Sequence, residues 1–120
     1  MIMKKILIVD DDKDLLVGLN ALLTNKGYKI KTIAEGLSAS DMTQNFNPDL
    51  ILLDVHLADS DGIQICFELK NNSRTRHIPI LMISADSEDG EVIDHCPADG
   101  FMAKPLSLLS LYKTVESMTA

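Results

Sequence analysis

The chain has 120 residues, of which 46% are hydrophobic and 24% charged, and its formal net charge is −7. This composition indicates a globular domain with a core of its own and excludes a disordered chain. It offers no cluster of lysine and arginine, so it lacks the basic face of a nucleic-acid-binding domain or of a polybasic membrane contact. We therefore expect a single domain over residues 1–120 that touches neither nucleic acid nor a membrane.

The apolar segments and the cysteines indicate a cytoplasmic protein. No apolar run approaches the roughly 20 residues that span a bilayer. The first such run, Ile6–Val9, is cut by aspartates, which argues against a signal peptide. Cys66 and Cys96 form no CxxC motif or Cys/His cluster, so neither a disulfide framework nor a zinc site is predicted.

Apolar runs alternate with stretches of helical periodicity along the chain. Residues 5–9 predict a first strand, and leucines repeating over residues 15–23 predict a helix that ends near Gly27. Residues 28–34 are rich in β-branched side chains and predict a second strand. A weaker helical pattern follows over residues 37–46.

The second half continues this alternation. Residues 50–53 and 78–83 are apolar on both faces, which is typical of central parallel strands, and residues 100–103 predict a short fifth strand. A helix is predicted between the first two of these strands, and one face of it carries Ile63, Cys66, Phe67 and Lys70. The inner stripe of the last helix is predicted to be Leu108, Leu111, Tyr112, Val115 and Met118.

Strands that alternate with helices predict an α/β fold, in which a parallel sheet is covered on both faces. Five such pairs in this length suggest a flavodoxin-like (βα)5 three-layer sandwich with strand order 2-1-3-4-5. In such a sheet, ligands bind beyond the carboxyl ends of the strands, where the strand order reverses. The functional residues are therefore expected directly after the strands.

Polar residues follow four of the predicted strands: Asp10, Asp11 and Asp12, then Asp54, then Ser84, then Lys104. Carboxylates gathered at one edge repel one another unless a cation lies among them. Hard oxygen ligands favour Mg²⁺, which also takes phosphate oxygens into its shell. A carboxylate can accept a phosphoryl group covalently, and we expect Asp54 to do so beside Lys104 and the Ser84 hydroxyl.

Simpler structural roles remain open for these residues when each is taken alone. Asp12 is best explained as the N-cap of the first helix. Ser84 could serve only as the cap of a following helix. Phe101 could serve only as a core residue. Cys66 is predicted to be a small core residue.

Five segments resemble the response-regulator receiver family, in order and at the family's spacing: residues 6–12, 50–54, 61–62, 80–85 and 104–105. The resemblance implies that Asp54 is the phosphoacceptor. It implies that Asp11 and Asp54 bind Mg²⁺ through their carboxylates, Asp10 through water, and His56 through its backbone carbonyl. His56 and Asp86 occupy two positions that tune how long the phosphoryl group survives.

The resemblance also implies a switch. Ser84 matches the hydroxyl that is drawn to the phosphoryl group, and Phe101 matches the aromatic residue that responds to it. Lys104 matches the lysine that contacts the phosphoryl group, and its bond to Pro105 is expected to be cis. All of these roles follow from the family pattern alone.

Several positions depart from the family pattern. The family often has Met-Pro or Leu-Pro where this chain has Leu57 and Ala58, so we expect a less rigid loop after the acceptor. The switch aromatic is a phenylalanine, which lacks the hydroxyl of tyrosine. Residues 85–104 are few and include Gly90 and Pro97, which predicts a short or mobile fourth helix and puts partner contacts there in doubt.

The function implied is a phosphoryl-accepting switch rather than an enzyme. Its donor would be a sensor histidine kinase or a histidine phosphotransfer protein, and its target an output domain or effector protein, with a homodimer left open. The natural protein is either a stand-alone receiver or a longer regulator with an output domain, and we favour the second. The alternative is a pseudo-receiver that binds partners without phosphorylation.

Two enzyme-like alternatives fit less well. A haloacid-dehalogenase type of enzyme would explain Asp10-x-Asp12 after a strand. However, Asp14 stands where that family has threonine or valine, and no cap domain fits in this length. A flavin carrier would need a phosphate loop rich in serine and threonine after the first strand, and no such loop follows Val9.

Overall fold

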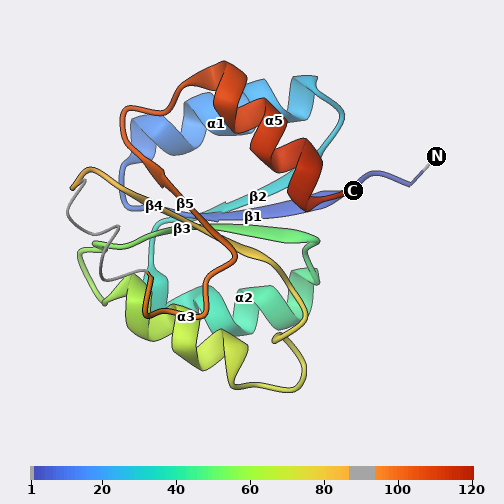
Figure 1. Ribbon diagram of the computed structural model, residues 1–120. Coiled ribbons are helices and arrows are strands. Elements are labelled where there is room, and N and C mark those ends of the chain that lie inside the picture. The colour runs from blue at the N-terminus through green and yellow to red at the C-terminus, as the bar shows by residue number, and fades with distance from the viewer. Residues whose placement is uncertain (1, 87–93) are drawn as a thin grey trace.

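The computed structural model describes residues 2–86 and 94–120 (Figure 1). Five strands form one sheet: β1 (Lys5–Val9), β2 (Lys29–Ile33), β3 (Leu50–Asp54), β4 (Ile80–Ser84) and β5 (Gly100–Ala103). Every neighbouring pair is parallel, and the order is β2-β1-β3-β4-β5. The predicted flavodoxin-like order is confirmed, and with it the reversal of strand order beside β1 and β3.

The helices cover both faces of the sheet. They are α1 (Lys13–Asn25), the 3-10 turn η1 (Gly36–Ser38), α2 (Ala39–Phe46), α3 (Gly62–Lys70) and α5 (Leu108–Met118). Helices α1 and α5 lie on one face, and α2 and α3 lie on the other (Figure 1). The predicted three-layer sandwich is confirmed. The prediction of a short or mobile fourth helix falls largely on residues 87–93, outside the described residues.

The sheet separates two cores because successive side chains of a strand point to opposite faces. On one side, Ile6 and Ile8 of β1 pack among the leucines of α1 and against Leu111 and Val115 of α5. On the other side, Leu7 of β1 packs in a cluster with residues of α2 and α3. Strands β1, β3 and β4 are therefore apolar at almost every position, as their sequences predicted.

Two helical faces differ from the prediction. In α3 the inner face is Gly62, Ile65, Cys66 and Leu69. Phe67 was predicted to face inward but is 39% exposed, because the true apolar stripe is rotated around the helix axis from the predicted one. Leu108 was placed on the inner stripe of α5 but is 44% exposed, since the first turn of α5 lies at the rim of a shallow groove.

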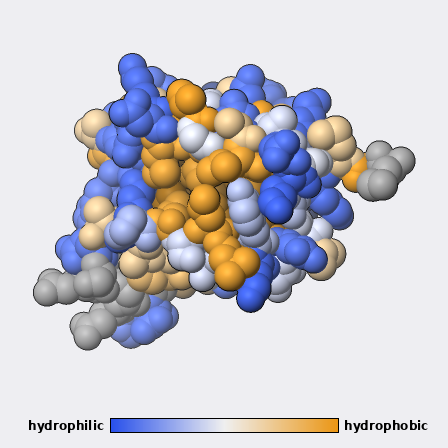
Figure 2. Space-filling model, turned by 90° about the horizontal axis from the view of Figure 1, so that it is seen from above, coloured by the Kyte–Doolittle hydropathy of each residue, from blue (hydrophilic) through white to orange (hydrophobic). Residues whose placement is uncertain are grey.

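This groove lies between α1 and the turn that leads into α5. It is lined by apolar side chains, among them Leu15, Leu19, Pro105, Leu106 and Leu108. Figure 2 looks onto the face formed by α1 and α5 and shows apolar side chains gathered along it. Val17 and Leu109 are also largely exposed.

The chain reverses at positions suited to the required backbone. Gly27 has φ of +98° directly after α1, close to the predicted helix end, and glycine adopts this left-handed region without steric cost. Asp12 caps α1 by accepting the Leu15 N–H at 3.1 Å, which confirms its predicted capping role. Among the described residues, no helix is both long and apolar enough to cross a bilayer.

Candidate functional site

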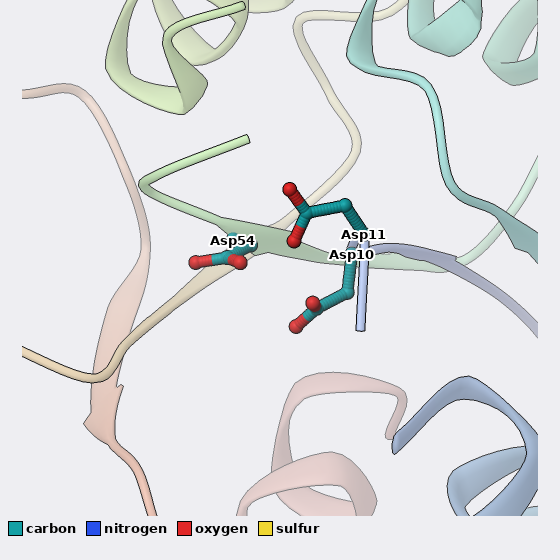
Figure 3. A group of neighbouring side chains, drawn as sticks. All are labelled: Asp10, Asp11 and Asp54. Atoms are coloured by element: carbon teal, nitrogen blue, oxygen red, sulfur yellow. The ribbon is translucent and has the colours of Figure 1, made fainter. Parts of the chain in front are cut away.

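Three carboxylates meet at the carboxyl edge of the sheet. Asp10 and Asp11 follow β1, and Asp54 is the last residue of β3, the neighbouring parallel strand. One carboxylate oxygen from each lies within 4.8 Å of the other two. Figure 3 shows the three side chains gathered where β1 and β3 end. The structure thus brings together the three acids that the sequence predicted to converge.

Asp54 is nearly buried, with 5% of its surface exposed. Its Oδ1 accepts a hydrogen bond of 3.2 Å from the backbone N–H of His56. The pKa of Asp54 is raised from 3.8 to about 6, mainly by burial and next by the charge of Asp10, while Lys104 acts in the opposite direction. The carboxylate is therefore poorly solvated but still ionised at neutral pH.

Asp10 is fully buried and is held by two contacts. Its Oδ1 accepts the Asp12 N–H at 2.9 Å, and its Oδ2 lies 2.8 Å from Lys104 Nζ. The ammonium of Lys104 also lies 3.5 Å from Asp54 Oδ2. Burial disfavours the charged lysine, but the hydrogen bond to Asp10 and the two negative charges raise the pKa of Lys104 overall.

Lys104 reaches this position from the end of β5, two strands away from β3 in the sheet. Its backbone N–H donates to the carbonyl oxygen of Ser84 at 2.7 Å, which fixes the chain as it leaves β5. The bond between Lys104 and Pro105 is cis, as the family pattern implied. The amine therefore lies on the same rim as Asp54, which is the condition on which the predicted site depended.

Asp11 is exposed and faces the loop between β3 and α3. Its Oδ2 accepts the N–H of Ala58 at 2.7 Å. His56 lies in the same loop, and its bridge to Asp61 closes the turn. The role of the His56 carbonyl as a metal ligand stays a prediction.

Ser84 and Phe101 occupy adjacent strands near the site. Ser84 is fully buried, and its Oγ accepts the N–H of Asp86 at 3.0 Å, so it stabilises the turn after β4. Phe101 pairs with Met82 in the sheet and is partly buried against the core beside α3. The switch roles of Ser84 and Phe101 and the influence of His56 and Asp86 on phosphoryl lifetime stay predictions.

Two contacts at the site had no counterpart in the sequence analysis. In one, the N–H of Ala58 donates to the carboxylate of Asp11. In the other, the N–H groups of Gly36 and Leu37 donate to the carboxylate of Asp59. The sequence offers no signal for either, because a backbone donor is present at every residue except proline. Only the folded loop shows which donor faces which carboxylate.

The comparisons with known proteins agree with this geometry. The model of the response regulator receiver domain family matches residues 6–116. This chain belongs to the response-regulator receiver family. The receiver domain is 37% identical over 117 residues to response regulator PleD of Caulobacter vibrioides; the match covers 96% of this chain and 26% of PleD. It therefore spans about a quarter of that relative.

Solved structures share the whole fold of the receiver domain. Chemotaxis response regulator CheY4 of Vibrio cholerae superposes with a TM-score of 0.89 at 27% identity, covering 98% of this chain and 99% of that one. Response regulator protein TrrA of Thermotoga maritima, in complex with Mg²⁺-BeF, superposes with a TM-score of 0.87 at 26% identity, covering 97% and 99%. Both are similar in length to this chain.

The acidic pocket of the receiver domain has the chemistry of a divalent-cation site. Its donors are carboxylate oxygens, which suit a hard cation such as Mg²⁺ better than a soft transition metal. Burial and, after it, the charge of Asp10 raise the pKa of Asp54, and a bound cation would act in the opposite direction. Asp11, the most exposed of the three acids, leaves the pocket open to solvent on its side.

We expect Asp54→Asn to stabilise the metal-free receiver domain at neutral pH. Between the unfolded pKa near 3.8 and the folded pKa of about 6, the folded state holds a proton that the unfolded state has lost, so stability falls as pH rises through this window. The asparagine variant avoids this loss and should gain about 2 kcal/mol at pH 7–8.

Thermal melts in EDTA at pH 4 and pH 7.5 would measure this gain. The difference between variant and wild type should be present at pH 7.5 and nearly absent at pH 4, where Asp54 of the wild type is protonated. An equal melting temperature for both proteins at pH 7.5 would show that the pocket is not crowded.

Proposed function

We propose that this receiver domain accepts a phosphoryl group on Asp54 in a Mg²⁺-dependent reaction and that phosphorylation changes its binding to a partner. One observation carries the proposal: Lys104 Nζ lies 3.5 Å from Asp54 Oδ2 and 2.8 Å from Asp10 Oδ2, at the open edge of the sheet. A nucleophilic carboxylate, a neighbouring cation and a cluster of further acids are the parts that phosphoryl transfer requires.

The residues of the chain divide the work as follows. Asp54, ionised at neutral pH, supplies the attacking oxygen. A bond forms from this oxygen to phosphorus as the bond between phosphorus and the donor's imidazole nitrogen breaks, and the imidazole leaves with the electron pair of that bond. Lys104 neutralises an oxygen of the incoming group, and the nearby Ser84 hydroxyl donates to another. Asp10, Asp11, Asp54 and the His56 carbonyl would hold Mg²⁺, which would supply the charge that screens the phosphoryl oxygens from the carboxylates.

The proposed donor is a phosphohistidine on a sensor histidine kinase or a histidine phosphotransfer protein. After transfer, Ser84 would be drawn toward the phosphoryl group and Phe101 would follow, shifting a two-state equilibrium. The partner would be an output domain or an effector protein, with homodimerisation as one route to it. We place the protein in the cytoplasm and infer that its only catalysis is its own phosphorylation and dephosphorylation.

Acetyl phosphate with Mg²⁺ tests the proposal without the natural donor. Intact-protein mass measurement should show a gain of one phosphoryl group in the wild type, and EDTA should prevent it. Asp54→Asn should abolish the gain, whereas Asp41→Asn, which changes an exposed acid of α2, should retain it. A wild type that stays unmodified by acetyl phosphate and by phosphohistidine donors would reject the proposal in favour of a pseudo-receiver.

A further inference from the structure

The loop between β3 and α3 touches the acidic pocket through a backbone donor. The N–H of Ala58 donates to Asp11 Oδ2 at 2.7 Å, across 47 residues of sequence. Hydrogen bonds to an ionised carboxylate are short and stronger than neutral ones. This bond engages Oδ2, and one carboxylate oxygen of Asp11 lies within 4.8 Å of an oxygen of Asp10 and of Asp54 (Figure 3).

A proline at this position could not make the contact, because proline has no N–H. The receiver family often has proline here, and this chain has alanine. The alanine therefore keeps a donor at a point of the loop that reaches Asp11, a predicted metal ligand. It also removes the rigidity that proline would bring, so the loop needs another means of holding its shape.

Asp59 supplies that means from the next position. Its Oδ1 accepts the Gly36 N–H at 3.0 Å, and its Oδ2 accepts the Leu37 N–H at 3.1 Å. These donors lower the pKa of Asp59, with Leu37 making the largest contribution. We use the name Asp59 clamp for the two hydrogen bonds that the carboxylate of Asp59 accepts from Gly36 and Leu37 at the start of η1.

The turn at Gly36 packs tightly enough for the clamp to fix the loop. A Cβ at Gly36 would lie 2.6 Å from Leu57 Cδ1 and would overlap Ser60 Oγ, so the side chains of the loop lie directly against this glycine. Ser60 Oγ also donates to Asp59 Oδ1 at 2.9 Å. The residues on both sides of Ala58 are therefore held against the turn before α2.

We propose that the Ala58 N–H is a positioning group for the metal ligand Asp11 and that the Asp59 clamp holds it in place. The inference rests on the proposed Mg²⁺ site and deepens it. A carboxylate already oriented by a second partner loses less freedom when it binds a cation, and partners of this kind tune metal affinity.

Titration calorimetry with Mg²⁺ alone, without a phosphoryl donor, tests the first link. Ala58→Pro removes the N–H and should weaken Mg²⁺ binding by about tenfold. The matched control Ala58→Gly keeps the N–H and should bind Mg²⁺ like the wild type. Equal Mg²⁺ affinity for the proline and glycine variants, or tighter binding by the proline variant, would overturn the proposal.

The second link is tested at Asp59, which is exposed and outside the acidic pocket. Asp59→Ala should weaken Mg²⁺ binding, and Asp59→Asn, which keeps one acceptor oxygen, should restore part of the affinity. Because the clamp acts through Ala58, the double variant Ala58→Pro/Asp59→Ala should bind Mg²⁺ no more weakly than Ala58→Pro alone. Fully additive losses would overturn the link between the clamp and Ala58.

The same samples separate this inference from the proposed function. A wild type that binds no Mg²⁺ and accepts no phosphoryl group from acetyl phosphate would overturn both. A wild type that does both, beside an Ala58→Pro variant of unchanged Mg²⁺ affinity, would overturn the positioning role alone. Melting temperatures measured without metal show whether each variant is folded. The rise in melting temperature when Mg²⁺ is added gives a second measure of Mg²⁺ binding beside calorimetry.

Discussion

Gly62→Ala is expected to cost the domain at least about 3 kcal/mol of folding free energy and to disturb the phosphoacceptor directly. A Cβ at Gly62 would overlap the backbone carbonyl oxygen of Asp54 and lie 2.9 Å from Val55 Cα. These are backbone atoms of the central strand and its exit, and they cannot turn aside as a side chain could. The Gly62 N–H also donates to Val55 O at 2.8 Å, so α3 begins pressed against the end of β3.

Urea unfolding of the metal-free protein would measure this cost, and Gly18→Ala provides the matched control. Gly18 lies within α1, and a Cβ there would have nothing within 4 Å. Alanine in a helix interior is favoured over glycine by roughly 0.5–1 kcal/mol, so the control should gain stability. If the two alanine variants proved equally stable, the close approach of α3 to Asp54 would be wrong.

Lys104→Met is expected to lower the free energy of unfolding by about 3 kcal/mol at neutral pH in metal-free buffer. Its ammonium lies 2.8 Å from a carboxylate oxygen of Asp10, which is fully buried, and removing one partner of a buried pair leaves the other charge uncompensated. The loss should shrink in acid as Asp54 takes up a proton, because less negative charge then remains in the pocket. Phosphorylation by acetyl phosphate should also slow strongly, since the incoming oxygens lose their cation.

Thermal and urea unfolding at pH 5 and pH 7.5 would check this expectation. Adding Asp10→Asn to Lys104→Met should recover most of the lost stability, because the carboxylate that needed the ammonium is then gone. Lys31→Met, which removes an exposed lysine of β2, should have little effect. A Lys104→Met protein as stable as the wild type at both pH values would mean that the Asp10 pair contributes nothing.

The order of the strands and the residues of the site could be predicted because both depend on local pattern and chain order. Strands that are apolar on both faces, such as Leu50–Leu53, require helices on both sides of the sheet. In a parallel sheet every strand delivers its next residue to the same edge, so Asp10, Asp54 and Lys104 were bound to meet there. Length and alternation indicated the fold class, and the strand order was predicted by analogy with flavodoxin-like sheets.

The rotation of helices was less accessible from sequence. In α3, Phe67 suggested an inner face because it is large and apolar, but Ile65 and Leu69 fill the space against the sheet. Five apolar residues in a nine-residue helix allow more than one stripe. Which stripe faces inward depends on the approach angle of the helix, and that angle depends on contacts distant in sequence, such as that of Gly62 with the end of β3.

By itself, the sequence determined the fold class, the strand order and the set of acids, hydroxyl and lysine at one edge of the sheet. Only the tertiary structure decided that Lys104 pairs more closely with Asp10 than with Asp54, and that Ala58 rather than a side chain holds Asp11. The physical reason is one of scale. Residue type and periodicity place a side chain on a face and at an edge, whereas ion pairs and hydrogen bonds depend on tenths of an ångström that arise when separate loops pack together.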